Sequence, residues 1–133
     1  MHDDSINHDD TCLIVFINFD IVNFLMDVSF EEFKKLDIRV GMIKDVEQIE
    51  GSEKLIKLIV DFGDEERQAV AGIKNYYSAE ELIGNKFVFI LNLERRKMMG
   101  VESQCMILAA SDDNGNVILL KPEQDIAVGS KIR

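Results

Sequence analysis

The chain has 133 residues, of which 47% are hydrophobic and 30% charged, with a net charge of −10. This length is enough for one domain with a modest core, and the composition is that of an ordinary globular protein. The acidity argues at first against a nucleic-acid partner. The charge is uneven, however. Residues 1–26 carry five acids and no Lys or Arg, which leaves 15 bases against 20 acids, a net charge of −5, in the remainder. A local basic surface is therefore compatible with this composition.

The residue inventory argues against an enzyme. Cys12 and Cys105 are too few and too isolated for a disulfide framework or a zinc site, and they read as reduced thiols of a cytoplasmic protein. The only histidines, His2 and His8, lie in the polar N-terminal stretch, so no Ser/His/Asp or Cys/His grouping is present. Acidic runs fall at predicted turns and helix starts. The sequence therefore predicts no catalytic residue, no cofactor and no metal.

The first 25 residues look separate from the remainder of the chain. His-Asp-Asp occurs at 2–4 and again at 8–10, which is either a metal-binding pattern or, as we favour, a disordered tail. The apolar run 12–25 is shorter than the about 20 residues that span a bilayer, and it lacks signal-peptide features. It is an added strand or helix, or no natural part of a protein that begins at Met26. We expect an extension at 1–26, a single domain at 27–133 and no membrane partner.

Two capping boxes predict short helices. Ser29-Phe-Glu-Glu32 predicts a helix at about 29–35. Three apolar side chains are expected on its inner side: Phe30, Phe33 and Leu36. Ser78-Ala-Glu-Glu81 predicts a second helix, which Gly84 would end.

Strand patterns dominate the remainder of the chain. The expected strands and extended segments are 38–46, 55–62, 67–71, 86–91, 106–110, 117–120 and 126–132. Gly41 is expected to mark a bulge in the first of these strands. The second and third strands are expected to form a hairpin. Asn114-Gly115 predicts a hairpin turn between two later strands.

A basic loop lies between the strands at 86–91 and 106–110. It holds three consecutive cations, Arg95, Arg96 and Lys97, the densest positive charge in the chain. Amide and hydroxyl groups lie nearby in the sequence. This combination is what a protein needs to bind a phosphate backbone and to contact the bases beside it.

The segment Asn92-Leu-Glu-Arg-Arg-Lys-Met-Met-Gly-Val-Glu-Ser-Gln-Cys-Met-Ile-Leu108 resembles the Asn-Leu-x-Pro-x-Lys-Met-x-Gly-x-x-Ser-x-Gly-Met-x-Leu signature of the tRNA-binding domain family. Leu36-Asp-Ile-Arg-Val-Gly41 and Arg67-Gln-Ala-Val-Ala-Gly-Ile-Lys-Asn-Tyr-Tyr77 resemble its opening strand and middle segment. The resemblance implies an all-β fold with short helices, a five-stranded OB-fold or Greek-key β-barrel, here with N-terminal and C-terminal extensions. It also implies a module like the C-terminal domain of methionyl-tRNA synthetase.

The resemblance implies non-catalytic binding of tRNA, largely by shape. Arg96 and Lys97 would neutralise phosphates, with Arg95 adding charge to the RNA-binding loop. Asn92 and Ser103 would hydrogen-bond base or sugar edges, and Met106 would pack against an unstacked base. Arg95 replaces the usual proline, and Cys105 replaces a glycine. The first change frees φ. The second is unfavourable if the glycine needs a positive φ or a close approach of RNA.

Four further residues have two interpretations each. Arg39 is either a solvated charge or a group near the RNA surface, and Lys54 is a phosphate contact or a solvated Lys. Tyr76 and Tyr77 could stack on bases. We favour core packing with a buried hydroxyl hydrogen bond for the tyrosines.

The expected partners are tRNA, a methionyl-tRNA synthetase and a second copy of the chain, since two-fold dimers are common. One alternative function is a protein-binding chaperone of the same fold linked to secretion, whose loop reads more like Asn-Phe-Pro-Pro-Arg-Arg-Ile-Ala-Gly. Leu93, Lys97-Met98 and Ser103–Met106 favour the tRNA-binding branch. The other alternative is a module that dimerises or docks a synthetase.

Overall fold

The computed structural model describes residues 25–133, and the His-Asp-Asp repeats and most of the apolar run therefore lie outside the described residues. The chain divides into two compact units, Met1–Lys35 and Leu36–Arg133. The predicted boundary between an extension at 1–26 and a domain at 27–133 stays a prediction. No helix among the described residues is long and apolar enough to cross a membrane.

The first unit contains the helix α3 (Phe30–Phe33), which begins as predicted at Ser29. The Ser29 hydroxyl accepts a hydrogen bond from the Glu32 backbone N–H at 3.1 Å. The predicted inner face is wrong, because no residue of α3 is buried and Phe30 is 70% exposed. Leu36, in the second unit, is also exposed. The capping box specifies where a helix starts, but it does not provide a surface for the helix to cover.

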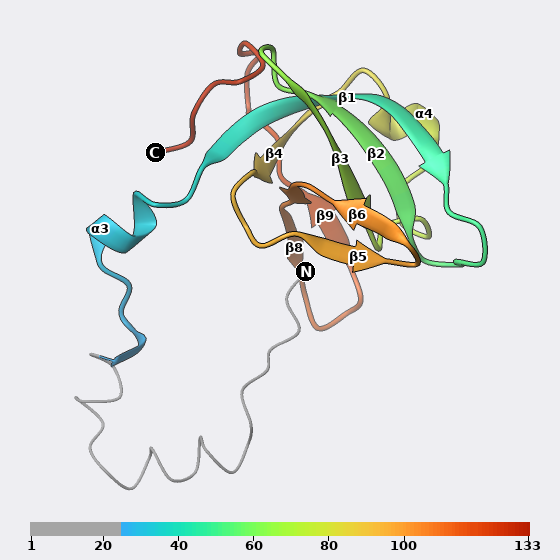
Figure 1. Ribbon diagram of the computed structural model, residues 1–133, viewed down its shortest axis with the longest axis horizontal. Helices are drawn as coiled ribbons and strands as arrows, with labels where there is room; N and C mark the ends of the chain where they lie inside the picture. The colour runs from blue at the N-terminus through green and yellow to red at the C-terminus, as the bar shows by residue number, and fades with distance from the viewer. Residues whose placement is uncertain (1–24) are drawn as a thin grey trace, which may run out of the picture. The chain divides into compact units, whose positions relative to one another are not determined.

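The second unit is an antiparallel five-stranded sheet in the order β3-β2-β1-β4-β7, nearly closed into a barrel (Figure 1). Its strands are β1 (Ile38–Gln48), β2 (Ile56–Asp61), β3 (Glu66–Ala71), β4 (Lys86–Ile90) and β7 (Met106–Ile107). Hydrogen bonds between Gln68 and Gln104 join β3 to the chain entering β7. The all-β OB-fold with short helices is thereby confirmed, as is the β2–β3 hairpin.

The long strand β1 pairs with both β2 and β4, so it must curve strongly. Its register with β2 shifts between Ile43 and Asp45, which places the bulge there and corrects the prediction of a bulge at Gly41. Gly41 has a different function. A Cβ atom at this position would lie 2.6 Å from Phe62 Cε1 and from Val60 Cγ1. The missing side chain therefore lets the core pack directly against the β1 backbone.

Alternating apolar side chains of the strands fill the barrel. Ile43, Leu58, Val60 and Phe89 are fully or almost fully buried. The rings of Phe62 and Phe89 meet edge to face, with centroids 5.4 Å apart, a preferred aromatic geometry. This core holds the β4 strand firmly at the point where the basic segment leaves the barrel.

The helix α4 (Ala79–Leu82) lies between β3 and β4, as predicted. Ser78 and Glu81 form both halves of the capping box, and Gly84 follows the helix with a φ of 83°. Tyr77 packs against the core, and its hydroxyl accepts a hydrogen bond from the Leu119 N–H at 3.0 Å. The core interpretation is confirmed for Tyr77, whereas Tyr76 is 48% exposed.

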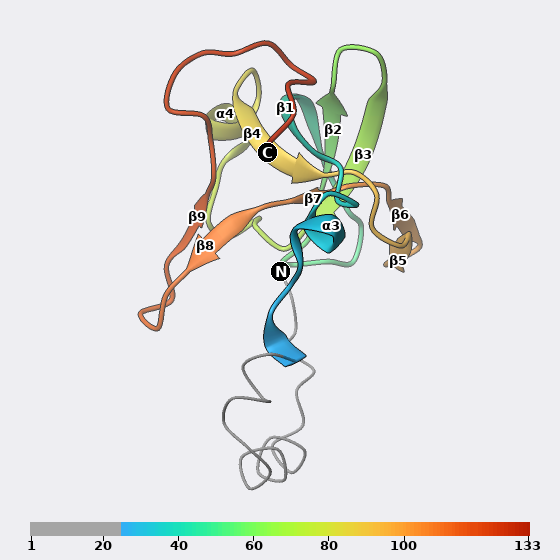
Figure 2. The same cartoon turned by 90° about the vertical axis from the view of Figure 1, so that its left-hand side faces the viewer.

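The chain after β7 forms a second ribbon and then returns to β1. Strands β8 (Ala109–Ser111) and β9 (Val117–Leu119) form the predicted hairpin, with Gly115 in its turn at a φ of 85°. Figure 2 shows this ribbon and the short strands β5 (Arg96–Met98) and β6 (Val101–Ser103) on opposite sides of the barrel. The C-terminal segment runs along β1, where the Ile132 N–H donates to the Ile38 carbonyl at 2.9 Å. The predicted extended segment at 126–132 is therefore only partly confirmed, because a turn at residues 128–129, with Gly129 at a φ of 83°, interrupts it and only the residues that follow run along β1.

Candidate nucleic-acid interface

The basic segment between β4 and β7 is itself a β-hairpin. Its strands are β5 (Arg96–Met98) and β6 (Val101–Ser103). Met99 and Gly100 form the turn with φ angles of 53° and 80°. Two successive positive φ angles give a turn whose twist matches that of the flanking strands. The predicted loop is thus an ordered two-stranded ribbon.

The hairpin presents its two cations on opposite faces. Arg96 lies across from Ser103, and Lys97 lies across from Glu102. Because side chains alternate along a strand, Arg96 and Lys97 point in opposite directions. Both are exposed, and within residues 25–133 neither side chain makes a hydrogen bond or an ion pair. The charge of each is therefore available to an anionic group, and Lys97 lies across from the Glu102 carboxylate.

The Ser103 hydroxyl joins the hairpin to the barrel. It accepts a hydrogen bond from the Val70 N–H at 3.0 Å and donates one to the Cys105 carbonyl at 3.0 Å. Its proton is thereby committed within the protein, and one acceptor lone pair remains for another donor. The role predicted for Ser103 at a base or sugar edge stays a prediction.

Asn92 and Arg39 meet through Asp37. The Asn92 Oδ1 atom accepts a hydrogen bond from the Asp37 N–H at 2.7 Å. The Asp37 carboxylate takes both Nε and Nη2 of Arg39, at 2.8 and 2.9 Å. This hydrogen bond and the neighbouring acids raise the pKa of Arg39 above its ordinary value. The structure thus brings both predicted residues to Asp37, Asn92 to its backbone N–H and Arg39 to its carboxylate.

Arg95 contacts the point where the hairpin leaves and rejoins the barrel. Its Nη1 atom donates to the Leu91 carbonyl at 3.2 Å and to the Gln104 carbonyl. Arg67, from β3, donates its own Nη1 atom to the same two oxygens, at 2.6 and 3.3 Å. Arg95 therefore makes contacts that a proline could not make at this position.

The two remaining predicted residues differ in their surroundings. Met106 is half-buried in β7 and pairs with Ile90 of β4. Lys54 is exposed in the turn before β2. A Cβ atom at Gly51, in that same turn, would lie 3.4 Å from Met99 Cε. The tip of the hairpin therefore reaches the turn that carries Lys54.

Sequence reasoning missed Arg67, Gln68 and Gln104 as parts of this site. The Gln104 N–H donates to the Gln68 carbonyl at 2.9 Å, and the Gln68 Nε2 donates to the Glu102 carbonyl at 2.7 Å. Gln104 falls at an unspecified position of the family signature, and it was considered only as a nearby polar group and as part of the Ser103–Met106 run. Arg67 occupies a polar position of an alternating strand, and nothing local indicates that it reaches across to β4.

Cys105 lies buried beneath the base of the hairpin, 5% exposed. Burial raises the pKa of its thiol to about 12, although the positive charges of Arg67 and Arg95 act in the opposite direction. The thiol therefore stays protonated at neutral pH. Cys105 acts as a small apolar core residue here.

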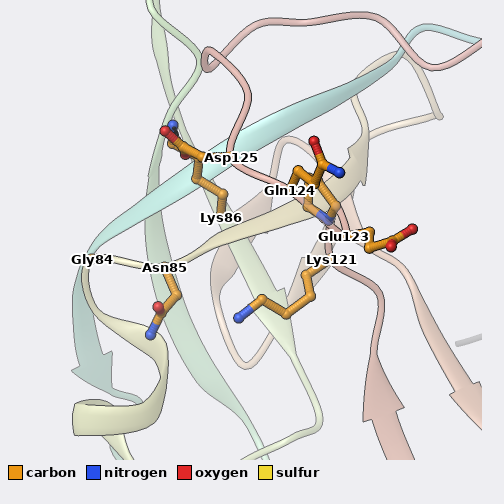
Figure 3. A pocket seen from close by; sticks show the side chains of 8 residues that line it. Gly84, Asn85, Lys86, Lys121, Glu123, Gln124 and Asp125 are labelled. Atoms are coloured by element: carbon orange, nitrogen blue, oxygen red, sulfur yellow. Dashed lines mark hydrogen bonds and ion pairs between the residues drawn. The ribbon is translucent and has the colours of Figure 1, made fainter.

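A shallow pocket of about 270 Å³ lies elsewhere on the barrel (Figure 3). Figure 3 shows the Lys86 side chain directed to Asp125, and their ion pair measures 2.8 Å. Lys121 also lines the pocket. No group of three or more His, Cys, Asp or Glu residues suited to a metal occurs in the described part of the chain.

The fold and the site together define an OB-fold binding domain with a cationic hairpin beside one end of β4. The sequence model of a family described as "Putative tRNA binding domain" matches residues 38–131. The chain belongs to this tRNA-binding domain family, as the sequence motifs predicted.

Relatives support the same assignment. The chain is 53% identical over 108 residues to the methionine–tRNA ligase of Methanocaldococcus jannaschii, a match that covers 81% of this chain and 16% of the ligase. The chain thus spans about one sixth of that relative's length. It also resembles the solved structure of a MetRS-related protein from Pyrococcus horikoshii, with a TM-score of 0.76 and 43% identity, covering 81% of this chain and all of that one.

The alternative function also has a structural neighbour. The chaperone CsaA from Bacillus anthracis matches with a TM-score of 0.73 and 31% identity, over 80% of this chain and 99% of that one. The family match and the relatives favour the tRNA-binding domain.

Proposed function

We propose that the chain binds tRNA non-catalytically and largely by shape, at the outer corner of the L. The observation that carries this proposal is the β5–β6 hairpin, whose Arg96 and Lys97 are exposed and make no hydrogen bond or ion pair within residues 25–133. A protein of a tRNA-binding family that presents uncommitted cations on an ordered ribbon has the groups that phosphate contacts need.

The other predicted residues have supporting roles in this proposal. Arg95 adds charge at the base of the hairpin and Lys54 adds charge near its tip, while Arg39 contacts RNA although its charge is paired with Asp37 and Asp64. Asn92 and Ser103 offer polar groups to base or sugar edges, and Met106 supports an unstacked base. Arg39 is held by Asp37, and Arg95 is held by the Leu91 carbonyl, before RNA binds. Such pre-ordering lowers the entropy lost on binding.

The setting of this activity is also part of the proposal. The chain works in the cytoplasm, with no membrane partner, as a homodimer or in association with a methionyl-tRNA synthetase. Exposed apolar side chains on β9 and the following segments support a homodimer: Ile118, Leu120, Ile126 and Ile132. The match to a methionine–tRNA ligase supports the synthetase as a partner.

A competition experiment separates tRNA binding from the chaperone alternative. Labelled bulk tRNA is bound to the full chain and challenged with unlabelled tRNA, with unstructured RNA or with an unfolded polypeptide. Recognition by shape predicts that tRNA competes best and the polypeptide does not compete. In parallel, the chain is tested for suppression of the aggregation of a heat-denatured protein. Suppression of aggregation without saturable tRNA binding would replace this proposal with the chaperone function that CsaA's name describes.

A further inference from the structure

Two guanidinium groups converge at the base of the β5–β6 hairpin. Arg67 comes from β3 and Arg95 from the segment just before β5, yet both donate Nη1 to the carbonyls of Leu91 and Gln104. The two Nη1 atoms therefore lie within two hydrogen-bond lengths of each other. Leu91 is where the chain leaves the barrel, and Gln104 is where it returns. We call this point, where Leu91 and Gln104 lie together, the neck of the hairpin.

This arrangement has an excess of positive charge. Arg67 forms an ion pair with Glu65, whereas Arg95 has no ion pair within the described residues. Like charges this close repel each other. One anion between the two groups would turn this repulsion into attraction.

Unused donors are available for such an anion. Each guanidinium has five N–H donors in a planar fork. Arg95 uses only Nη1, and Arg67 uses Nη1 and Nε, so the Nη2 groups of both make no hydrogen bond within residues 25–133. Arginine forks match the oxygens of a phosphate and hold it more strongly than a neutral donor does.

We propose that Arg67 and Arg95 form a phosphate-binding subsite at the neck of the hairpin, which takes one backbone phosphodiester of RNA. Arg67 belongs to the barrel strand β3 and Arg95 to the hairpin segment, so the bound phosphate links the two. The subsite rests on the proposed function and extends it, because it adds a contact from β3 to those from Arg96 and Lys97. An RNA chain is the occupant that the adjacent uncommitted cations favour, since it offers phosphates in series.

The test measures the affinity of the full chain for bulk tRNA across a salt series. Each phosphate contact contributes about 0.7–0.9 to the slope of log affinity against log salt. Arg67→Met is expected to reduce the magnitude of the slope by about that amount, and Arg67→Lys, which keeps the charge, is expected to restore it. Lys121→Met is the control, because Lys121 lies over the Phe87 ring and outside these contacts. It should leave the slope unchanged.

If Arg67→Met unfolds the barrel, Arg95→Gln keeps the test decisive, because Arg95 is exposed. The Arg95→Gln variant should also reduce the magnitude of the slope. An unchanged slope in folded Arg67→Met or Arg95→Gln would mean that the pair is only structural and would overturn the subsite. If Arg96→Ala/Lys97→Ala still reduced the magnitude of the slope, the proposed function would survive the loss of the subsite. The absence of saturable tRNA binding by the unchanged chain would overturn both.

Discussion

Ser103 has a structural role that its predicted contact with RNA does not explain. Its hydroxyl accepts from the Val70 N–H and donates to the Cys105 carbonyl, and it thereby links β3, β6 and the entry to β7. Val70 is 7% exposed, so water cannot easily replace this acceptor. The hydroxyl thus holds the base of the hairpin in place whether or not RNA is bound.

Replacement of Ser103 by Ala should therefore destabilise the barrel. The Val70 N–H would lose its acceptor, and we expect the free energy of unfolding to fall by about 1–3 kcal/mol. Urea denaturation followed by circular dichroism measures this difference. Ser111→Ala is the matched control, because Ser111 is exposed at the end of β8 and should change stability by less than about 0.5 kcal/mol. Equal stabilities of the two variants would contradict this structural role.

Cys105 should be inert in the folded protein. Burial raises the pKa of its thiol to about 12, whereas an unfolded thiol ionises near about 8.5. In a Cys12→Ser variant, iodoacetamide should therefore alkylate Cys105 much more slowly in the native state at pH 8 than in urea. The folded pKa is the higher one. The stability that the protonated Cys105 thiol contributes is therefore complete below about pH 8.5 and decreases as the pH rises toward 12. Equal alkylation rates in the two states would show that the thiol is accessible.

At the scale of the element, the turn of the β5–β6 hairpin sets the positions of its cations. Met99 has a φ of 53°, and no other described non-glycine residue has a positive φ. Gly100 has a φ of 80°, and a Cβ atom there would meet nothing within 4 Å. The need for glycine at this position is therefore conformational and not steric.

Gly100→Ala should strain the turn without a clash, at a cost of about 1–2 kcal/mol. We expect faster amide hydrogen exchange in β5 and β6, because the hairpin would open more often, while the barrel strands exchange as before. Affinity for tRNA should fall with an unchanged salt slope, because no charge is lost. Gly72→Ala is the control, since a Cβ there makes only an ordinary contact with Leu55. Unchanged exchange in the hairpin would contradict the strain argument.

Local signals predicted the elements that local physics decides. Both helix starts, the Asn114-Gly115 hairpin and the alternating strands were confirmed, because each depends on neighbouring residues. The β5–β6 hairpin was missed, since its strands have three residues each and Met99 is an unusual turn residue. The bulge near Ile43 follows from how β1 pairs along the barrel, which no single strand encodes.

The site was predicted as a set of residues but not as a set of contacts. Asn92 contacts Asp37, 55 positions away, and Ser103 contacts Val70, 33 positions away. Hydrogen bonds of this range depend on how the barrel closes. The sequence therefore indicated which groups are available, and the fold determines which of them are already engaged.

At the scale of the whole molecule, an acidic protein carries a small cationic site. The net charge of −10 repels RNA at long range, and salt screens that repulsion beyond about 8–10 Å. Binding must therefore depend on short-range contacts made after the hairpin has met its partner. We expect little electrostatic steering of association.

The proposed homodimer makes a prediction about the β9 surface. Ile118 is 58% exposed, and a lysine there would introduce a charge that an apolar interface cannot easily bury. In sedimentation velocity, the unchanged chain should have twice the 15.2 kDa chain mass. Ile118→Lys should shift the population toward the monomer. Ile83→Lys, also at an exposed isoleucine, is the control and should remain dimeric. A monomer in the unchanged chain at micromolar concentration would rule out the dimer.

The most direct test of the account is the binding of bulk tRNA to the full chain over a salt series, with and without the hairpin cations. Three to five phosphate contacts predict a log–log slope of about −2 to −4, and Arg96→Ala/Lys97→Ala should reduce its magnitude by about 1–2. That result would place the RNA contacts on the β5–β6 hairpin. A lack of saturable binding at low salt, or the same slope in the double variant, would contradict the assignment.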